Sequence, residues 1–392
     1  MDPKPSILRS ADLVQQEKDT LAPYAMQSAD TRGREYPLSP DPWRTEFQRD
    51  RDRIIHSAAF RKLEYKTQVY MSYFGDYYRT RITHTMEVAQ IARTLARNLR
   101  LNSDLAEAIA LAHDVGHTPF GHSGETALQR VLAEDGGFEH NEQGLRVVEI
   151  LEERYPHISG LNLTYEVREG IIKHASEYDS PTVPQRFDPK LSPTLESQVC
   201  DVADEIAYNS HDIDDALKMN LIHESQLAEV EWVWEIFQQS RAPMMTDDAD
   251  KFVKFRSIGR IIEIMVADVL ETSAMNIETH GISSVAKVRE SPFRIVGFSK
   301  EMQEQNRQLK NFLMKYVYRH PNVVRMNSKA EYFVQRLFDL YLRIPEQLPL
   351  KYQNRVEKEG LKRVVTDYIS GMTDRYLQED YIRAFEPTSI NY

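Results

Sequence analysis

Apolar residues recur along most of this 392-residue chain at intervals of three and four, which is the spacing of one face of an α-helix. Clear stripes cover residues 88–99, 105–112 and 195–206. Further helical periodicity covers residues 252–270, 305–319, 329–343 and 360–378. The pattern predicts an all-α protein.

Proline and glycine interrupt this pattern at two places. Residues 1–50 are polar and punctuated by glycine and proline, which predicts an irregular N-terminal arm. Four prolines between residues 180 and 194 predict an extended connector between helical blocks. We therefore divide the rest of the chain into a helical core at 51–224 and a C-terminal helical region at 225–392.

Composition narrows the class of protein. Glycine accounts for 15 of 392 residues, which disfavours a fold with many glycine-rich βα turns. The formal net charge of −11 disfavours a protein that binds nucleic-acid backbone as its main partner. Cys200 is the only cysteine, and the first residues lack the pattern of a signal peptide, so we expect a cytoplasmic protein that does not enter a membrane.

Histidine is distributed unevenly. Seven of the 12 histidines fall between residues 84 and 174, where even scattering would place about three. These are His84, His113, His117, His122, His140, His157 and His174. A single histidine is more often an ordinary surface or core residue, but the clustering favours a metal site.

Three helices carry residues that suit one metal ion. His84 lies at the edge of the first apolar stripe and points inward, and His113 and Asp114 follow directly on the second. Asp201, Asp204, Tyr208 and Asp212 share one face of the third helix. A solvated acidic face is the alternative interpretation, but few basic residues stand at i+4 to neutralise these carboxylates.

We predict that His84, His113, Asp114 and Asp204 bind one divalent ion. Imidazole and carboxylate ligands without thiolate suit Mn, Fe, Co, Ni or Mg, and leave positions open for water and phosphate. A His-Asp dipeptide alone is weak evidence, because the same chain also contains His211-Asp212.

The order of several motifs adds a specific resemblance. The segments RITHTMEVAQIARTL, LAHDVGHTPFGHSGE, FEHNEQ and DVADEIAYNSHD follow one another as in HD-domain deoxynucleoside triphosphate triphosphohydrolases, the bacterial dGTPase-like family. The similarity extends through residues 30–69, 166–179 and the segment RVVTDYISGMTDRY, and so covers most of the chain. It implies an HD-domain core at 51–224, and a metal-dependent enzyme that hydrolyses dGTP or several dNTPs to deoxynucleoside and inorganic triphosphate.

The resemblance also implies roles for residues around the metal. His122 and Glu125 correspond to the pair beside the scissile bond, where the imidazole protonates the leaving oxygen and the carboxylate orients it. Glu125 as a simple helix cap is the alternative. His140 matches a further active-site histidine and is the rival proton donor. His117 matches a loop residue that touches the phosphates, and Arg81 and Lys173 are the expected phosphate contacts.

The sugar contacts implied by the resemblance are Gln68, Tyr208 and Asp212. A tyrosine ring that fills the 2′ position excludes ribose by steric clash. Tyr208 as a core aromatic is the alternative. Tyr368, Asp374 and Tyr376 are expected near the same pocket, which the region 225–392 would complete together with contacts between subunits.

Two other functions stay open at this point. Another HD-type phosphodiesterase or nucleotidase would need the same four ligands without a triphosphate pocket. A regulatory protein that responds to dNTPs or single-stranded DNA would retain the fold without turnover, although intact ligands and an intact His122 and Glu125 argue against it. Resembling proteins are often tetramers or hexamers with dNTP or single-stranded DNA effectors, so we expect a homo-oligomer.

Overall fold

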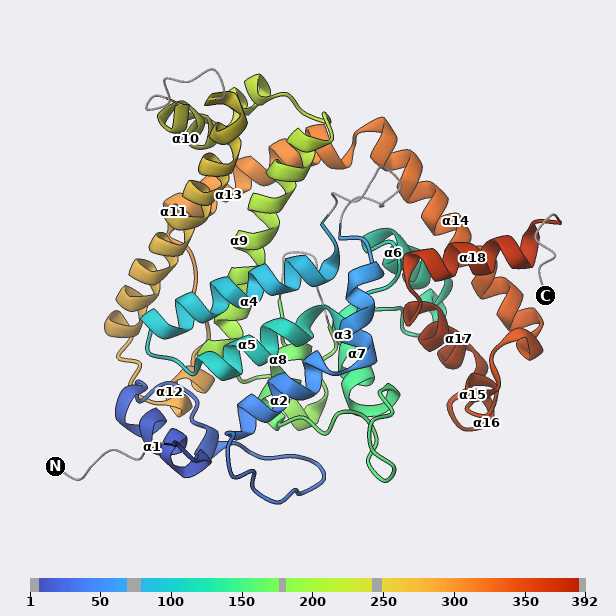
Figure 1. Ribbon diagram of the computed structural model, residues 1–392, viewed down its shortest axis with the longest axis horizontal. Coiled ribbons are helices and arrows are strands. Elements are labelled where there is room, and N and C mark those ends of the chain that lie inside the picture. The colour runs from blue at the N-terminus through green and yellow to red at the C-terminus, as the bar shows by residue number, and fades with distance from the viewer. Residues whose placement is uncertain (1–6, 69–78, 176–180, 242–248, 388–392) are drawn as a thin grey trace.

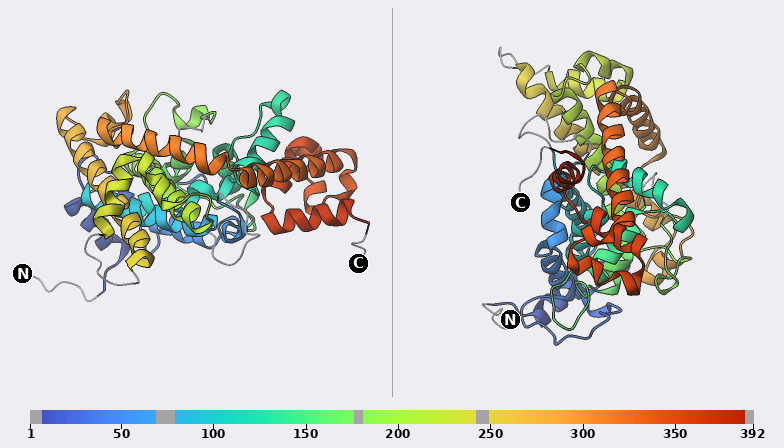
Figure 2. Two further views of the ribbon diagram at one scale, coloured as in Figure 1. Left: turned by 90° about the horizontal axis from the view of Figure 1, so that it is seen from above. Right: turned by 90° about the vertical axis from the view of Figure 1, so that its right-hand side faces the viewer.

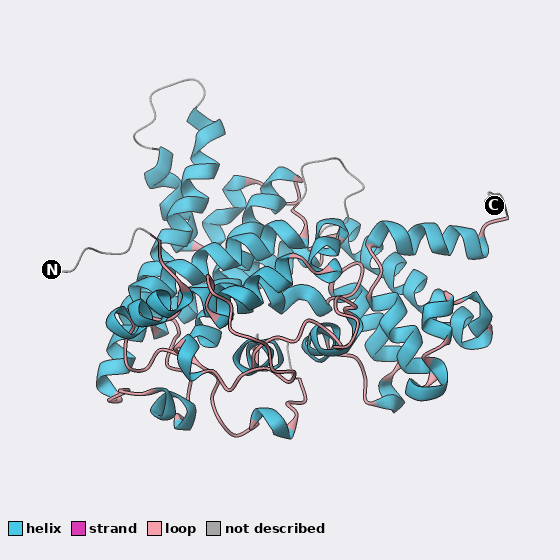
Figure 3. Cartoon of the chain, turned by 60° about the horizontal axis from the view of Figure 1, so that its bottom comes forward, coloured by secondary structure: helices cyan, strands magenta, loops and turns pink. Residues whose placement is uncertain are grey.

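The computed structural model describes residues 7–68, 79–175, 181–241 and 249–387. Within these ranges the chain forms helices, turns and loops but no strand, as Figures 1 and 3 show. The all-α prediction is confirmed.

The helices of the first half surround the segment that was predicted to bind metal. Their bounds are α1 Ser10–Thr20, α2 Glu46–Ile55, α3 Ala58–Lys62, α4 Arg81–Asn98, α5 Ser103–Ala112, α6 His122–Val131, α7 His140–Arg146, α8 Tyr165–Ile172 and α9 Leu195–Lys218. A single 3₁₀ turn, η4, covers His113–Gly116 and continues directly from α5.

The second half is also mainly helical in its described residues. Its helices are α10 Glu231–Arg241, α11 Ala249–Thr279, α12 Val285–Glu290, α13 Lys300–Leu313, α14 Pro321–Arg343, α15 Leu350–Gln353, α16 Val356–Glu359, α17 Leu361–Ser370 and α18 Asp374–Phe385. Two single π-helical turns extend other helices. η6 at Val147–Leu151 continues α7, and η9 at Met314–Tyr318 continues α13.

Two expectations about elements need correction. The N-terminal arm, expected to be irregular, contains α1, which buries none of its residues and so left no apolar stripe in the sequence. The periodic stretch at 360–378 is two helices, because α17 ends at Gly371 and Thr373 begins α18 by accepting a hydrogen bond from the Tyr376 amide. The spacing of apolar residues continues across this turn, so the sequence pattern does not reveal the break between α17 and α18.

Three long helices hold the centre of the molecule together. α4 packs on both α5 and α9, and α5 also packs on α9. Leu95 of α4, Ile109 of α5 and Val199 of α9 are fully buried in this contact. Because α4, η4 and α9 each carry predicted metal ligands, this packing is what brings the ligands together.

The buried side chains form two separate cores. The first runs from Ala25 to Val323 and includes α4, α5, α9, α11 and α13. The second joins Leu128 and other residues of α6 to α14, α17 and α18, which form a block at one end of the molecule in Figure 2. Packing thus crosses the division near residue 225, which stays a prediction.

None of the helices in the described ranges combines enough length with enough apolar character to cross a bilayer.

Candidate active site

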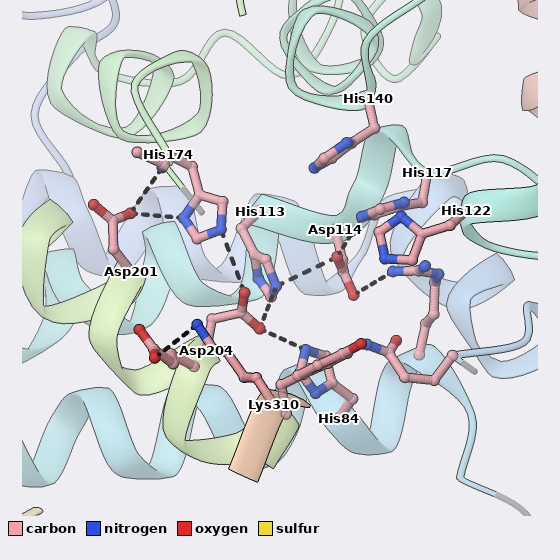
Figure 4. A pocket seen from close by; sticks show the side chains of 15 residues that line it. His84, His113, Asp114, His117, His122, His140, His174, Asp201, Asp204 and Lys310 are labelled. Atoms are coloured by element: carbon pink, nitrogen blue, oxygen red, sulfur yellow. Dashed lines mark hydrogen bonds and ion pairs between the residues drawn. The ribbon is translucent and has the colours of Figure 1, made fainter. Parts of the chain in front are cut away.

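A pocket lies where α4, η4, the start of α6 and α7, α9 and α13 meet (Figure 4). Six of the seven clustered histidines line it, and His157 does not. The lining residues are Gln68, Arg81, His84, His113, Asp114, His117, His122, His140, His174, Ala175, Asp201, Asp204, Glu205, Tyr208 and Lys310. The histidine cluster of the sequence is therefore a cluster in space.

The four predicted metal ligands converge on one side of this pocket. The ligand atoms of His84, His113 and Asp114 all lie within 4.8 Å of one another. Asp204 Oδ1 lies 2.8 Å from His84 Nε2 and 3.7 Å from His113 Nε2. The side chains of His84, His113 and Asp114 are buried, and that of Asp204 is partly exposed to the pocket.

The hydrogen bonds around these imidazoles fix their orientation. His113 Nδ1 lies 2.6 Å from the carbonyl oxygen of Ala110, so this nitrogen carries the proton and donates it. His113 Nε2 is buried and has no hydrogen-bond partner among the described residues. His84 Nδ1 lies 3.3 Å from Nδ1 of His211, whose Nε2 bonds Glu87. A buried, unprotonated nitrogen that faces two carboxylates suits a metal ligand.

The protonation states of the predicted ligands also bear on whether they can bind a divalent ion. Burial would raise the pKa of Asp114, but the electrostatic influence of the His113 ring and of the Arg81 guanidinium holds that pKa well below its usual range. Burial would likewise raise the pKa of Asp204, and hydrogen bonds with His174 and His84 lower it well below its usual range. Burial lowers the pKa of His113, which favours the neutral imidazole. Burial would lower the pKa of His84, but the hydrogen bond with Asp204 and the charge of that carboxylate raise it, so metal binding there would release a proton. Two ionised carboxylates and two imidazoles form a donor set that fits Mn, Fe, Co, Ni or Mg.

A second cluster joins the other predicted catalytic residues. Glu125 Oε1 lies 3.0 Å from His140 Nδ1 and also accepts a hydrogen bond from the His140 amide at 3.0 Å. His122 Nδ1 is 3.7 Å from Glu125 Oε2, and its side chain is 59% exposed. Burial would raise the pKa of Glu125, but hydrogen bonds with His122 and His140 hold that pKa far below its usual range. Glu125 is therefore an ionised carboxylate between two imidazoles.

His117 connects the two clusters. Its Nε2 lies 3.1 Å from Asp114 Oδ1, and its ring stacks on the His140 ring with centroids 3.9 Å apart. Arg81, another predicted phosphate contact, is buried in the pocket wall with Nη1 3.0 Å from Asp114 Oδ2. Both residues thus border the metal site, and Arg81 also balances the charge of a ligand.

An adjoining cavity of about 310 Å³ shares Gln68, His122 and Tyr208 with the pocket. It is otherwise lined by Phe120, Ser123, Met314, Tyr318, Val323 and Asn327. Gln68 and Tyr208, two of the predicted sugar contacts, therefore stand between a polar compartment and a more apolar one.

Two predicted substrate contacts have other partners. Lys173 does not line the pocket, because its Nζ donates to Glu169 Oε1 at 2.9 Å and to the carbonyl oxygens of Asp188 and Leu191. Asp212 is buried and accepts a hydrogen bond from the Tyr318 hydroxyl. Burial raises the pKa of Asp212 to about 7.

The predicted contacts near the C-terminus also lie outside the pocket. Tyr368 belongs to the second core, and its hydroxyl is 3.2 Å from that of Tyr376, which is exposed. Asp374 is buried at the first residue of α18, where Oδ2 accepts from the Thr67 amide at 2.9 Å and Oδ1 from the Phe120 amide at 2.9 Å. Asp374 thus holds two segments that border the pocket and does not face into it.

Five pocket residues were not predicted as site residues, namely His174, Ala175, Asp201, Glu205 and Lys310. His174 bonds Asp201 Oδ1 at 2.7 Å and lies 3.5 Å from Asp204 Oδ2. Lys310 of α13 pairs with Glu205 at 3.0 Å. The clustering of histidines and the shared face of α9 were signals for His174 and Asp201. Nothing in the sequence connects Lys310 to residues about one hundred positions earlier.

Comparison with known proteins agrees with this geometry. The HD domain family matches residues 81–209, and the phosphohydrolase-associated domain family matches residues 296–383. A deoxyguanosinetriphosphate triphosphohydrolase-like protein of Geobacter metallireducens is 50% identical over 95% of this chain and 97% of its own length. Proteins of the same description from Geobacter sulfurreducens and Thiobacillus denitrificans are 49% and 48% identical, each over 95% of this chain and over 96% and 99% of their own lengths.

Proposed function

Because the chain belongs to the HD-domain family of deoxyguanosinetriphosphate triphosphohydrolase-like proteins, we propose that it is a metal-dependent enzyme that hydrolyses dNTPs. The reaction takes place at the α-phosphorus and releases deoxynucleoside and inorganic triphosphate. The observation that carries the proposal is one pocket lined by His84, His113, Asp114 and Asp204 and also by His122 and His140, which both contact Glu125 behind it.

The metal would be held by His84, His113, Asp114 and Asp204. A divalent ion there would supply Lewis-acid chemistry, which stabilises charge on the phosphate oxygens and activates the attacking water. His113 is prepared for this role by its bond to the Ala110 carbonyl, and His84 by its contact with His211. The ion is Mn, Mg, Fe, Co or Ni on the chemistry of the donors.

His122 is the proposed proton donor to the leaving 5′-oxygen. Its ring is exposed at the pocket, whereas His140 is buried under the ring of His117 and hydrogen-bonded to Glu125. Ionised Glu125 lies beside both imidazoles, so it can orient the His122 ring toward the leaving oxygen. His140 is the rival donor, since it makes the shorter contact with Glu125.

The triphosphate would lie against the cations of the pocket. Arg81 of α4 and Lys310 of α13 line it, beside His117 in the loop after η4, where burial lowers the pKa of His117 well below its usual range and keeps its ring neutral. Cations fixed around the phosphates are the expected means of stabilising a phosphoryl-transfer transition state. Lys173 has no part in this scheme, because all of its donors are bonded within the fold.

The deoxynucleoside would occupy the adjoining cavity. Its apolar wall of Phe120, Met314 and Val323 suits a nucleobase, and Gln68 and Tyr208 stand where the sugar would lie between base and phosphates. A hydroxyl at the 2′ position would meet the Tyr208 ring, so we infer a preference for deoxyribose. The base is guanine or more than one base.

The enzyme is also proposed to act in the cytoplasm as a homo-oligomer, a tetramer or hexamer, with dNTP or single-stranded DNA as possible effectors. This part rests on resemblance to the family. Size-exclusion chromatography with light scattering, with and without dNTPs, would test the assembly.

A product assay tests the central proposal. The purified protein is incubated with each of the four dNTPs, singly and mixed, in Mn²⁺ and in Mg²⁺. We expect deoxynucleoside and triphosphate released as one piece. Release of dNMP with pyrophosphate, or of orthophosphate in steps, would contradict the proposal and point to another HD phosphodiesterase or nucleotidase.

A further inference from the structure

A third cavity lies on the reverse side of η4 from the metal ligands, and we call it the rear cavity. It has a volume of about 240 Å³ and shares no lining residue with the two compartments of the candidate site. Val115 and Gly116 of η4 form part of its wall, and α3, α7, η6, α15, α17 and adjoining loop residues such as Lys66 supply the rest. Only one turn of backbone therefore separates it from Asp114 and His117.

Three lysines line the rear cavity, and two of them have no acidic partner. Lys62 and Lys66 make no ion pair with any described residue, and Lys351 pairs with Glu153 at 2.9 Å. Lys62 Nζ donates to the carbonyl oxygen of Gly371 at 2.6 Å. Lys66 Nζ donates to the carbonyl oxygens of His117 at 2.5 Å and Ser370 at 2.9 Å.

The other carboxylates that line the rear cavity already have ion-pair or hydrogen-bond partners within the protein. Asp367 is paired with Arg146 and Arg355. Glu152 accepts hydrogen bonds from the amides of Ala58 and Ala59 at the start of α3. The positive charges of Lys62 and Lys66 therefore lack a neighbouring carboxylate within ion-pair distance in the described part of the chain.

A buried ammonium group without a counter-charge is costly for a protein. Lys66 is 3% exposed, and burial together with the charge of Lys62 lowers the pKa of Lys66 to about 7. A bound anion would supply the missing counter-charge to the buried Lys66 ammonium and would reduce the repulsion between Lys62 and Lys66. It would also touch the one side chain that bonds the backbone of His117.

We propose that the rear cavity binds a small phosphate-type anion at Lys62 and Lys66, and that the bound anion steadies the turn carrying Asp114 and His117. Phosphate and ammonium groups make charge-assisted hydrogen bonds, which are about twice as strong as neutral ones. The cavity is smaller than the ~300–1,000 Å³ of pockets for drug-sized ligands, which favours an inorganic ion over a whole nucleotide. The proposal does not depend on dNTP hydrolysis.

Calorimetric titration of the metal-loaded protein with inorganic phosphate tests the site. We expect saturable binding that weakens roughly tenfold or more in Lys62→Gln, because one charged partner is lost, and that persists in Lys62→Arg. Lys310→Gln is the matched control, since it removes a lysine from the catalytic pocket and should leave this affinity unchanged. A parallel titration with tripolyphosphate tests whether the product of the proposed reaction also occupies the rear cavity.

Hydrogen exchange supplies the second readout. Phosphate should slow exchange of the amides of residues 113–121 in the parent and in Lys310→Gln, but not in Lys62→Gln. The exposed position of Lys62 makes its variants suitable, and their melting temperatures verify folding. Absence of saturable binding in the parent overturns the proposal. So does an affinity that falls with Lys310→Gln and not with Lys62→Gln, because phosphate would then lie only in the catalytic pocket.

Discussion

Asp204 touches three imidazoles, those of His84, His113 and His174, and no other carboxylate does so in the described pocket. We therefore expect Asp204→Ala and His113→Ala to lose bound metal and turnover together. Asp201→Ala is the control, since Asp201 touches the cluster only through His174 and should lower activity by roughly 10–100-fold with the metal retained. The test is to measure metal content and turnover in the same samples. Full activity with a full complement of metal in Asp204→Ala would contradict the ligand assignment.

Proton donation can be separated from metal binding at His122. We expect His122→Ala and Glu125→Gln each to reduce turnover by ~10²–10⁴-fold with the metal still bound. The double variant should be little worse than the worse single variant, because residues that act as a unit are not additive. His140→Ala is the comparison: if it abolishes turnover while His122→Ala leaves it nearly intact, the proton comes from His140.

Tyr208 offers a test of sugar selection. Its ring borders both compartments and lies 6.3 Å from that of Tyr318, centroid to centroid. Removing it in Tyr208→Ala opens space at the expected 2′ position, so the ratio of kcat/KM for dNTP to that for NTP should fall. Tyr318→Phe, which keeps the ring, serves as the control. An unchanged ratio in Tyr208→Ala would make Tyr208 a packing residue only.

At the scale of elements, the start of α18 controls the loop before α6. Asp374 accepts from the amides of Thr67 and Phe120, and Phe120 has a φ of 61°, a backbone conformation that non-glycine residues rarely adopt. In Asp374→Ala both amides lose their buried acceptor, at a cost of about 1–3 kcal/mol each. We expect lower thermal stability and lower kcat, because His122 follows this loop directly.

Exposed Arg375→Ala, one residue further along α18, should behave like the parent. An Asp374→Ala variant that raises KM and leaves kcat and stability unchanged would restore the role of Asp374 as a substrate contact, which the sequence had suggested.

α4 and α9, which carry the predicted ligands His84 and Asp204, were predictable because each has a regular apolar stripe, and η4, which carries His113 and Asp114, follows directly on the apolar α5. The inward positions of His84, His113 and Asp204 follow from those stripes. Lys173, Asp212 and Asp374 lie outside the pocket lining and bond to partners within the fold, so their roles as substrate contacts stay predictions. Lys310 was missed because α13 reaches the pocket only through tertiary packing, and a local pattern contains no information about such a distant contact.

At the scale of the whole molecule, Glu196 links pH to stability. Its buried Oε1 accepts from the amides of Met26 and Asn102, yet burial raises its pKa to about 7. The folded state then binds a proton more tightly than the unfolded state, whose carboxyl titrates near 4.5. The contribution of Glu196 to the free energy of unfolding should therefore fall between about pH 4.5 and pH 7, by about 3 kcal/mol at most.

Denaturant unfolding at pH 5 and pH 8 measures this effect. The parent should lose stability relative to Glu196→Gln as pH rises, whereas exposed Glu271→Gln should follow the parent at both values. Identical pH dependence in the parent and Glu196→Gln would mean that Glu196 ionises normally.

The predicted metal ligands and the proposed proton donor are held by different hydrophobic cores. The predicted metal ligands lie on elements of the first core, while α6, which begins with His122 and contains Glu125, packs into the second core with α14. Heat that loosens only the C-terminal block would therefore move the proposed proton donor and leave the proposed ligand set in place. We then expect inactivation to precede the release of metal and the main unfolding transition, through a compact, metal-loaded state that no longer turns over substrate.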